Sequence, residues 1–126
     1  TWTQNVLVPW TVIDGPDAAR AFADSLAAKP ITRAPRTSVS GAIDFGVRLL
    51  ERSGVEPTRR VIDISGDGAN NQGRSVTEAR DEAVAKGITI NGLPILMKRG
   101  SGYWDMADLD LYYRDCVIGG QGAFMI

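Results

Sequence analysis

The sequence predicts an α/β domain with a doubly wound, mostly parallel sheet that has helices on both faces. Three observations support this prediction. Apolar runs with β-branched residues at 61–65 and 88–96 are typical of buried strands. Elsewhere apolar residues recur at helical spacing, and the two patterns alternate along the chain, as in parallel α/β sheets. With 126 residues, 44% of them hydrophobic, the chain can form one domain with one core.

The first half of the chain is expected to form one strand and two helices. A strand is expected at residues 5–10, at an edge of the sheet because Pro9 lacks a backbone N–H. A helix is expected to begin at Pro16, since proline suits the first helical position, and to stop before residue 30. A second helix is expected to begin with Thr37 or Ser38 as its N-cap and to end near residue 53. Its apolar positions cover more than half of the circumference of the helix, as in a helix buried against a sheet.

The second half is expected to continue the alternation. Between the strands at 61–65 and 88–96, Ser75 and Glu78 form a capping-box pattern that predicts the start of a helix, and Gly87 marks its end. A last helix is expected at residues 108–117. A glycine-rich turn at 119–122 and an extended segment at 123–126 follow it.

Composition excludes several classes of function. The net charge is −1, so no global field attracts nucleic acid or an anionic membrane. No stretch approaches the roughly 20 apolar residues of a membrane span. The chain has no histidine, so it cannot form a Ser-His-Asp triad or a His-ligated zinc site by itself. A metal would be held by oxygen, which favours magnesium, calcium or manganese.

A polar, glycine-rich loop follows the strand at 61–65 directly. It contains Asp67, Asn70 and Asn71, with Gly66 and Gly68 on either side of the aspartate. Ligands of parallel sheets bind beyond the carboxyl ends of the strands, which is where this loop lies. Glycine lets the backbone approach a ligand closely, and the polar side chains offer oxygen atoms. The alternative is a tight turn in which Asp and Asn bond to their own backbone.

Two segments resemble the metal-ion-dependent adhesion site of von Willebrand factor A domains. SGDG at residues 65–68 resembles the Ser/Thr-Asp-Gly element after the fourth strand of that fold, with one extra residue. RTSVSGAI at 36–43 resembles the threonine element that opens an apolar helix there. The resemblance implies that Asp67 and Thr37 are metal ligands, for Mg2+ or else Ca2+ or Mn2+. The residues expected at the rim of the site are Ser38, Gly66, Gly68, Asn70, Asn71, Tyr103 and Trp104.

A closer resemblance is to the DUF1194 proteins, a bacterial von Willebrand A-like group of unknown function. Four segments are similar to its hallmark sequences: VPWT at 8–11, VIDISGDGANNQGR at 61–74, GITINGLPIL at 87–96 and YYRDCVIGGQGAF at 112–124. They cover nearly the whole chain in order. The resemblance implies a single von Willebrand factor A-like (Rossmann-like) domain over residues 1–126, in an extracytoplasmic (periplasmic or secreted) location.

One element of that family is not found in the sequence. No Asp-x-Ser-x-Ser motif occurs, and Asp63-Ile64-Ser65 supplies only its first part. Family members carry the motif near their N-terminus, so the resemblance implies a partial domain without the first strand and helix and without a closing C-terminal helix. The sheet is then incomplete, and we expect a second chain, a domain swap or further residues to fill the gap. We also expect this chain alone to leave the metal site unoccupied.

A second resemblance is to the haloacid dehalogenase-like phosphatases. GDGANN at residues 66–71 is similar to their Gly-Asp-Gly-x-Asn-Asp motif, which binds magnesium after a strand, except that Asn71 replaces the last carboxylate. The nucleophilic Asp-x-Asp-x-Thr motif of those enzymes is not recognisable here. Their activity, magnesium-dependent phosphate-ester hydrolysis, is therefore kept as an alternative.

The leading functional expectation is a non-enzymatic, divalent-cation-dependent protein-binding module of the adhesion type. Its partner would be a protein that presents an acidic group to the cation, with no role for nucleic acid and no membrane span. A further alternative is a structural module whose metal site has lapsed. Asp63, within an apolar strand, is expected to make a structural bond to a neighbouring helix or arginine, because a buried carboxylate needs a partner.

Overall fold

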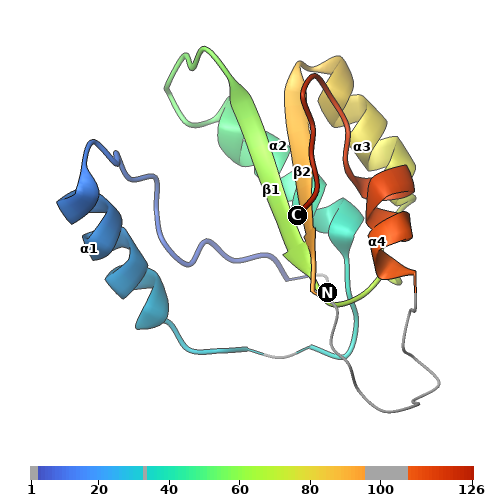
Figure 1. The fold of residues 1–126 in the computed structure, drawn as a ribbon, viewed down its shortest axis with the longest axis horizontal. Coiled ribbons are helices and arrows are strands. Elements are labelled where there is room, and N and C mark those ends of the chain that lie inside the picture. Colours follow the sequence, from blue (N-terminus) through green and yellow to red (C-terminus); the bar gives the residue numbers. More distant parts are fainter. Residues whose placement is uncertain (1–2, 33, 96–107) are drawn as a thin grey trace.

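A computed structural model describes residues 3–32, 34–95 and 108–126 (Figure 1). The elements, in chain order, are α1 (Pro16–Ala27), α2 (Val39–Glu51), β1 (Arg60–Gly66), α3 (Val76–Ala85), β2 (Ile88–Pro94), α4 (Leu109–Tyr112) and the π-helical turn η1 (Tyr113–Val117). The predicted α/β class is confirmed, and each of these helices and strands was expected within a few residues of its observed bounds. The helices of the described residues do not have the length and apolar character that would be needed to cross a membrane.

The centre of the fold is a parallel pair of strands. β1 and β2 pair in a register that runs from Arg60 opposite Ile88 to Gly66 opposite Pro94, and α3 provides the crossover between them. The C-terminal segment lies along the other edge of β2. Its contacts with β2 are an antiparallel bridge to Gly119, with N···O distances of 2.8 and 3.1 Å, and a parallel bridge near Met125. The C-terminal segment therefore joins the edge of the two-stranded sheet through isolated bridges.

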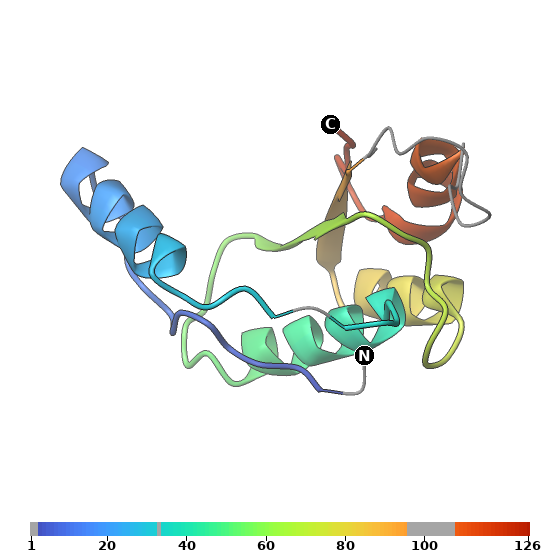
Figure 2. The ribbon, with the colours of Figure 1, turned by 90° about the horizontal axis from the view of Figure 1, so that it is seen from below.

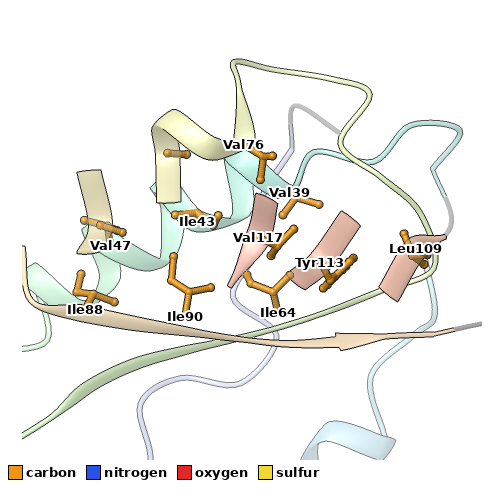
Figure 3. Close-up of a cluster of buried hydrophobic side chains, with 12 residues drawn as sticks. Val39, Ile43, Val47, Ile64, Val76, Ile88, Ile90, Leu109, Tyr113 and Val117 are labelled. Atoms are coloured by element: carbon orange, nitrogen blue, oxygen red, sulfur yellow. The ribbon is translucent and has the colours of Figure 1, made fainter. Parts of the chain in front are cut away.

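One face of the sheet carries the core. β1 contributes Ile62 and Ile64 to this face, and β2 contributes Ile88 and Ile90, as the twofold periodicity of a strand requires. α2, α3, α4 and η1 pack over them, and Figure 3 shows their buried side chains pointing at the strands. Full burial of an aliphatic side chain contributes about 1.5–3 kcal/mol, so this layer is the main source of stability.

The N-terminal region differs from the prediction. The prediction of a strand at residues 5–10 is wrong. This segment has no strand structure and pairs with no strand in the described part of the chain. Trp10 is 62% exposed, and Val6 and Leu7 are also exposed. α1 buries none of its residues and extends away from the sheet (Figures 1 and 2). The apolar pattern of a strand was present here, but an extended segment becomes a strand only when its backbone groups find a partner.

The helix starts also refine the prediction. Of the two proposed caps for α2, Ser38 serves: its Oγ accepts a hydrogen bond from Gly41 N at 3.2 Å. The prediction of a capping box at the start of α3 is wrong. Ser75 makes no side-chain cap bond, and its hydroxyl lies 2.8 Å from Thr77 Oγ1. The neighbouring hydroxyl competes for the same oxygen. α3 still begins immediately after Ser75, as expected.

Candidate functional site

Two segments far apart in sequence meet at the carboxyl end of β1. The loop after β1 and the residues just before α2 are joined by a reciprocal pair of hydrogen bonds. Thr37 N donates to Asn71 Oδ1 at 2.9 Å, and Asn71 N donates to the carbonyl of Thr37 at 3.0 Å. The predicted site loop and the predicted threonine element therefore lie side by side at the sheet edge where ligands of parallel sheets bind.

Thr37 lies against the backbone next to Asp67. A methyl group built on Gly68 would come 3.5 Å from Thr37 Oγ1, in ordinary van der Waals contact. Thr37 is half-buried and Asp67 is exposed. The two proposed ligands are thus a half-buried hydroxyl just before α2 and an exposed carboxylate in the loop after β1. Both are oxygen donors, the kind that a hard cation such as Mg2+ prefers.

Asn70 fixes the loop to the start of α2. Its Oδ1 accepts from both Ser40 N, at 3.1 Å, and Ser40 Oγ, at 3.2 Å, while its Nδ2 donates to the carbonyl of Arg74 at 3.0 Å. Its own backbone N–H donates to Tyr112 Oη at 3.2 Å. The amide oxygens of Asn70 and Asn71, both predicted at the rim of the site, are therefore engaged in positioning the loop.

Gly73 is the second point of close approach in the loop. Its φ of +96° lies in the left-handed region, which L side chains rarely adopt. A methyl group there would come 2.8 Å from Ser40 Oγ and 3.1 Å from Ser38 Oγ. Glycine at this position lets the loop close over the first turn of α2. Ser38, predicted as a rim residue, serves as the helix cap beneath it.

Tyr113 lies beneath the site and was not predicted to take part in it. Its ring is fully buried, and its hydroxyl is buried with no hydrogen-bond partner among the described residues. A methyl group on Gly66 would lie 2.7 Å from that hydroxyl, so a side chain at this rim position would have to displace it. Burial raises the pKa of Tyr113 to about 12, with smaller contributions from Tyr112 and from the charge of Asp67.

Arg74 clamps the far end of the loop to two helices. Its guanidinium donates to both carboxylate oxygens of Asp44 on α2, at 2.7 and 3.1 Å, and to both of Glu82 on α3, at 2.6 and 2.7 Å. These bonds raise the pKa of Arg74 and lower the pKa of Glu82. Sequence reasoning missed this clamp, because Asp44 lies 30 positions before Arg74 and the local pattern does not specify how α2 packs against α3.

Asp63 takes a different role from the expected one. It lies on the face of β1 opposite the core and is exposed, and its Oδ1 accepts from Asn91 Nδ2 of β2 at 2.8 Å. Its partner is therefore a neighbouring strand, and not a helix or an arginine. Asn91 Oδ1 in turn accepts from Phe124 N at 3.2 Å, which ties the C-terminal segment to β2.

The two proposed ligands are oxygen atoms, which suit a hard cation, but two are too few to complete its coordination. Asp67 and Thr37 supply two protein oxygens, whereas magnesium takes about six ligands with waters included. Among the residues that the structure describes, no group of three or more acidic or cysteine side chains could hold a metal ion. Tyr103 and Trp104, also predicted at the rim, lie outside the described residues.

Comparison with known protein families gave one informative result. The model of a family described as "Protein of unknown function (DUF1194)" matches residues 1–126, which is the whole chain. The comparisons with curated proteins and with solved structures gave no match.

Proposed function

The chain belongs to the DUF1194 family, and from that premise we propose that it is a divalent-cation-dependent, non-enzymatic protein-binding module. The cation would be held at the carboxyl edge of β1 by Asp67 and Thr37. It would bind an acidic group of a partner protein.

The observation that carries this proposal is the joining of the two predicted ligand segments. The reciprocal hydrogen bonds between Thr37 and Asn71 fix the threonine element against the loop that bears Asp67. Local sequence could not enforce that contact, because the two segments are separated by α2 and β1. The bonds of Asn70 and the Arg74 clamp hold the same loop, so little ordering is required when a ligand binds.

Each residue has a distinct role in the proposed site. Asp67 would contribute negative charge, directly or through a water molecule, and Thr37 would contribute a neutral hydroxyl oxygen. When bound, the cation supplies a positive charge with coordination positions still open, and a carboxylate of the partner can fill one of them. Water and further oxygen ligands would complete the coordination.

The phosphatase alternative receives less support from the contacts. In that interpretation the Asn-Asn pair at the end of GDGANN faces the metal. Here the amide oxygen of Asn70 accepts two bonds from Ser40, and that of Asn71 accepts from Thr37 N. Oxygen atoms that hold the loop in place are poor candidates for metal ligands. The structural-module alternative remains distinct, because it predicts no cation dependence at all.

The direct test is binding to an immobilised glutamate-containing peptide, with Mg2+ and with excess EDTA. We expect binding in Mg2+ that EDTA abolishes and that Asp67→Asn weakens about tenfold or more, since one charged contact contributes about 1.5–3 kcal/mol. Thr37→Val should weaken it less. Asp24→Asn, an equal charge change on the exposed face of α1, serves as the control. Binding that persists in EDTA, or that both aspartate variants reduce equally, would refute the proposal.

A further inference from the structure

A cavity opens at the amino end of the two strands, opposite the Asp67 loop. We call it the amino-end pocket. It has a volume of about 740 Å³ and is lined by the 57–60 loop, the end of α3 with Lys86 and Gly87, the start of β2 and the 120–122 turn. Sites for small molecules typically occupy about 300–1,000 Å³. The pocket is therefore large enough for an organic ligand, and it is separate from the Asp67 loop at the other end of the sheet.

Positive charge dominates the lining of the amino-end pocket. Arg59, Arg60 and Lys86 contribute to it, and no carboxylate does among the described residues that line it. Lys86 is partly neutralised, because its Nζ donates to Glu51 Oε1 at 2.7 Å. Neither Arg59 nor Arg60 forms a salt bridge within the described part of the chain. Arg59 thus lines the cavity without a carboxylate partner in the described part of the chain, whereas the charge of Arg60 also helps to lower the pKa of Glu51.

Arg59 reaches across the mouth of the amino-end pocket. Its Nη2 lies 3.8 Å from the position that a methyl group on Gly122 would take. Gly120, with a φ of +94°, packs so closely on the start of β2 that a methyl group there would lie 2.9 Å from the carbonyl of Ile88. The glycine turn therefore forms a fixed wall of backbone opposite the arginines.

The end of α3 offers a competing explanation for the basic residues. Cations near the carboxyl end of a helix are stabilised by its dipole, so Lys86 could serve that purpose alone. The last carbonyls are already bonded, however: Lys86 N donates to the carbonyls of Glu82 and Ala83, and Gly87 N donates to that of Val84. Arg59 comes from the loop before β1 and Arg60 is the first residue of β1, so neither belongs to α3. The helix end therefore does not account for them.

We propose that the amino-end pocket binds a small molecule that carries a phosphoryl group with at least two negative charges. Arg59 and Arg60 are its anchors, since guanidinium groups bind phosphate oxygens in a bidentate manner. The backbone of the 120–122 turn faces the ligand from the other side. The apolar atoms of Val84 and Ile88 at the base of the pocket leave room for an organic part.

The proposal is tested by calorimetric titration of the whole chain without metal. The probes are inorganic pyrophosphate, ADP, and phosphatidylcholine vesicles with and without phosphatidic acid. We expect saturable binding of pyrophosphate or ADP. Arg59→Gln should weaken it about tenfold, and the Arg59→Gln/Arg60→Gln double variant about a hundredfold, at roughly 1.4 kcal/mol for each tenfold change. Arg59→Lys keeps the charge but loses the planar, bidentate donors of the guanidinium group. Its affinity should therefore lie between those of the wild type and Arg59→Gln.

A matched control separates the pocket from net charge. Arg20→Gln/Arg114→Gln also removes two positive charges, from exposed sites on α1 and η1, and it should leave binding unchanged. Circular dichroism of each variant verifies the fold. Absence of saturable binding by the wild type, equal loss in both double variants, or binding only to vesicles with phosphatidic acid would overturn the proposal. Because no metal is present and Asp67 is untouched, its failure is distinct from failure of the cation site.

Discussion

The region before residue 33 and the region from residue 37 onward contain similar proportions of apolar residues. Among the described residues, only the second region buries them in a core. From residue 37 onward, the apolar side chains of α2, β1, α3, β2 and η1 meet in one buried cluster. Before residue 33, Leu7, Trp10 and Val12 are exposed, and α1 buries nothing. The difference shows that an apolar pattern becomes structure only where a second surface covers it. The candidate site lies on the packed region, with its loop fixed by that packing.

The largest contrast is expected from truncating one aliphatic side chain in each region. Ile43 of α2 is fully buried, so Ile43→Ala should lower the free energy of unfolding by about 3 kcal/mol. Leu26 of α1 is 46% exposed, and Leu26→Ala should change it by less than about 0.5 kcal/mol. Urea denaturation followed by circular dichroism measures both. Equal losses would mean that α1 is packed in solution and would remove the contrast.

A smaller but more local effect is expected at Asn70. Asn70→Ala removes three side-chain hydrogen bonds and leaves the N–H of Ser40 without its acceptor, which should cost about 2 kcal/mol. Asn5→Ala, in the exposed N-terminal segment, should stay within about 0.5 kcal/mol of the wild type. The same urea experiment applies. If Asn70→Ala is as mild as its control, the loop is not held by this side chain.

The Arg74 clamp predicts a pH dependence confined to the packed region. The pKa of Glu82 is lowered from its usual 4.5, chiefly by its hydrogen bonds with Arg74, so the folded protein binds this proton less readily than the unfolded chain does. The resulting stabilisation is present above about pH 4.5 and is lost as the pH falls through the lowered pKa. Glu82→Gln should flatten the fall of Tm below about pH 5. Asp24→Asn should leave the profile unchanged; a wild-type slope in Glu82→Gln would argue against the clamp.

The smallest effect is expected at Tyr113. Its hydroxyl is buried and has no partner among the described residues, so Tyr113→Phe removes a desolvated polar group without breaking a bond. We expect the free energy of unfolding to stay the same or to rise by up to about 1 kcal/mol. Tyr112→Phe loses the hydrogen bond from Asn70 N, so it should lower the free energy of unfolding by about 1 kcal/mol. A clear loss in Tyr113→Phe would indicate that its hydroxyl is bonded in solution.

Sequence reasoning succeeded where local pattern and burial agree. The β-branched run of β1, the proline at the start of α1 and the serine cap of α2 each reflect a local physical cause. It failed at residues 5–10, where the local pattern was right for a strand but no partner strand is described. It also failed at Ser75, whose hydroxyl pairs with Thr77 and leaves the cap unused.

For the site, the sequence located the loop but not what holds it. The resemblance singled out Asp67 and Thr37, and the loop's position after a buried strand supported it. The bond of Arg74 to Asp44, the bonds of Asn70 to Ser40 and the approach of Gly66 to the Tyr113 hydroxyl each join residues 30 or more positions apart. Such contacts are set by how α2, β1 and η1 pack. No spacing rule within one element could have predicted them.

The central claim is that a divalent cation binds between the Thr37 and Asp67 segments. Mn2+ is paramagnetic and weakens the NMR signals of nearby amides, so a titration of 15N-labelled protein locates the ion directly. The amide signals of Thr37, Gly68 and Asn71 should lose intensity first, and Asp67→Asn should abolish this loss. Signals of Gly87 and Gly122, at the other end of the sheet, should persist. Losses that begin elsewhere, or that are unchanged in Asp67→Asn, would contradict the claim.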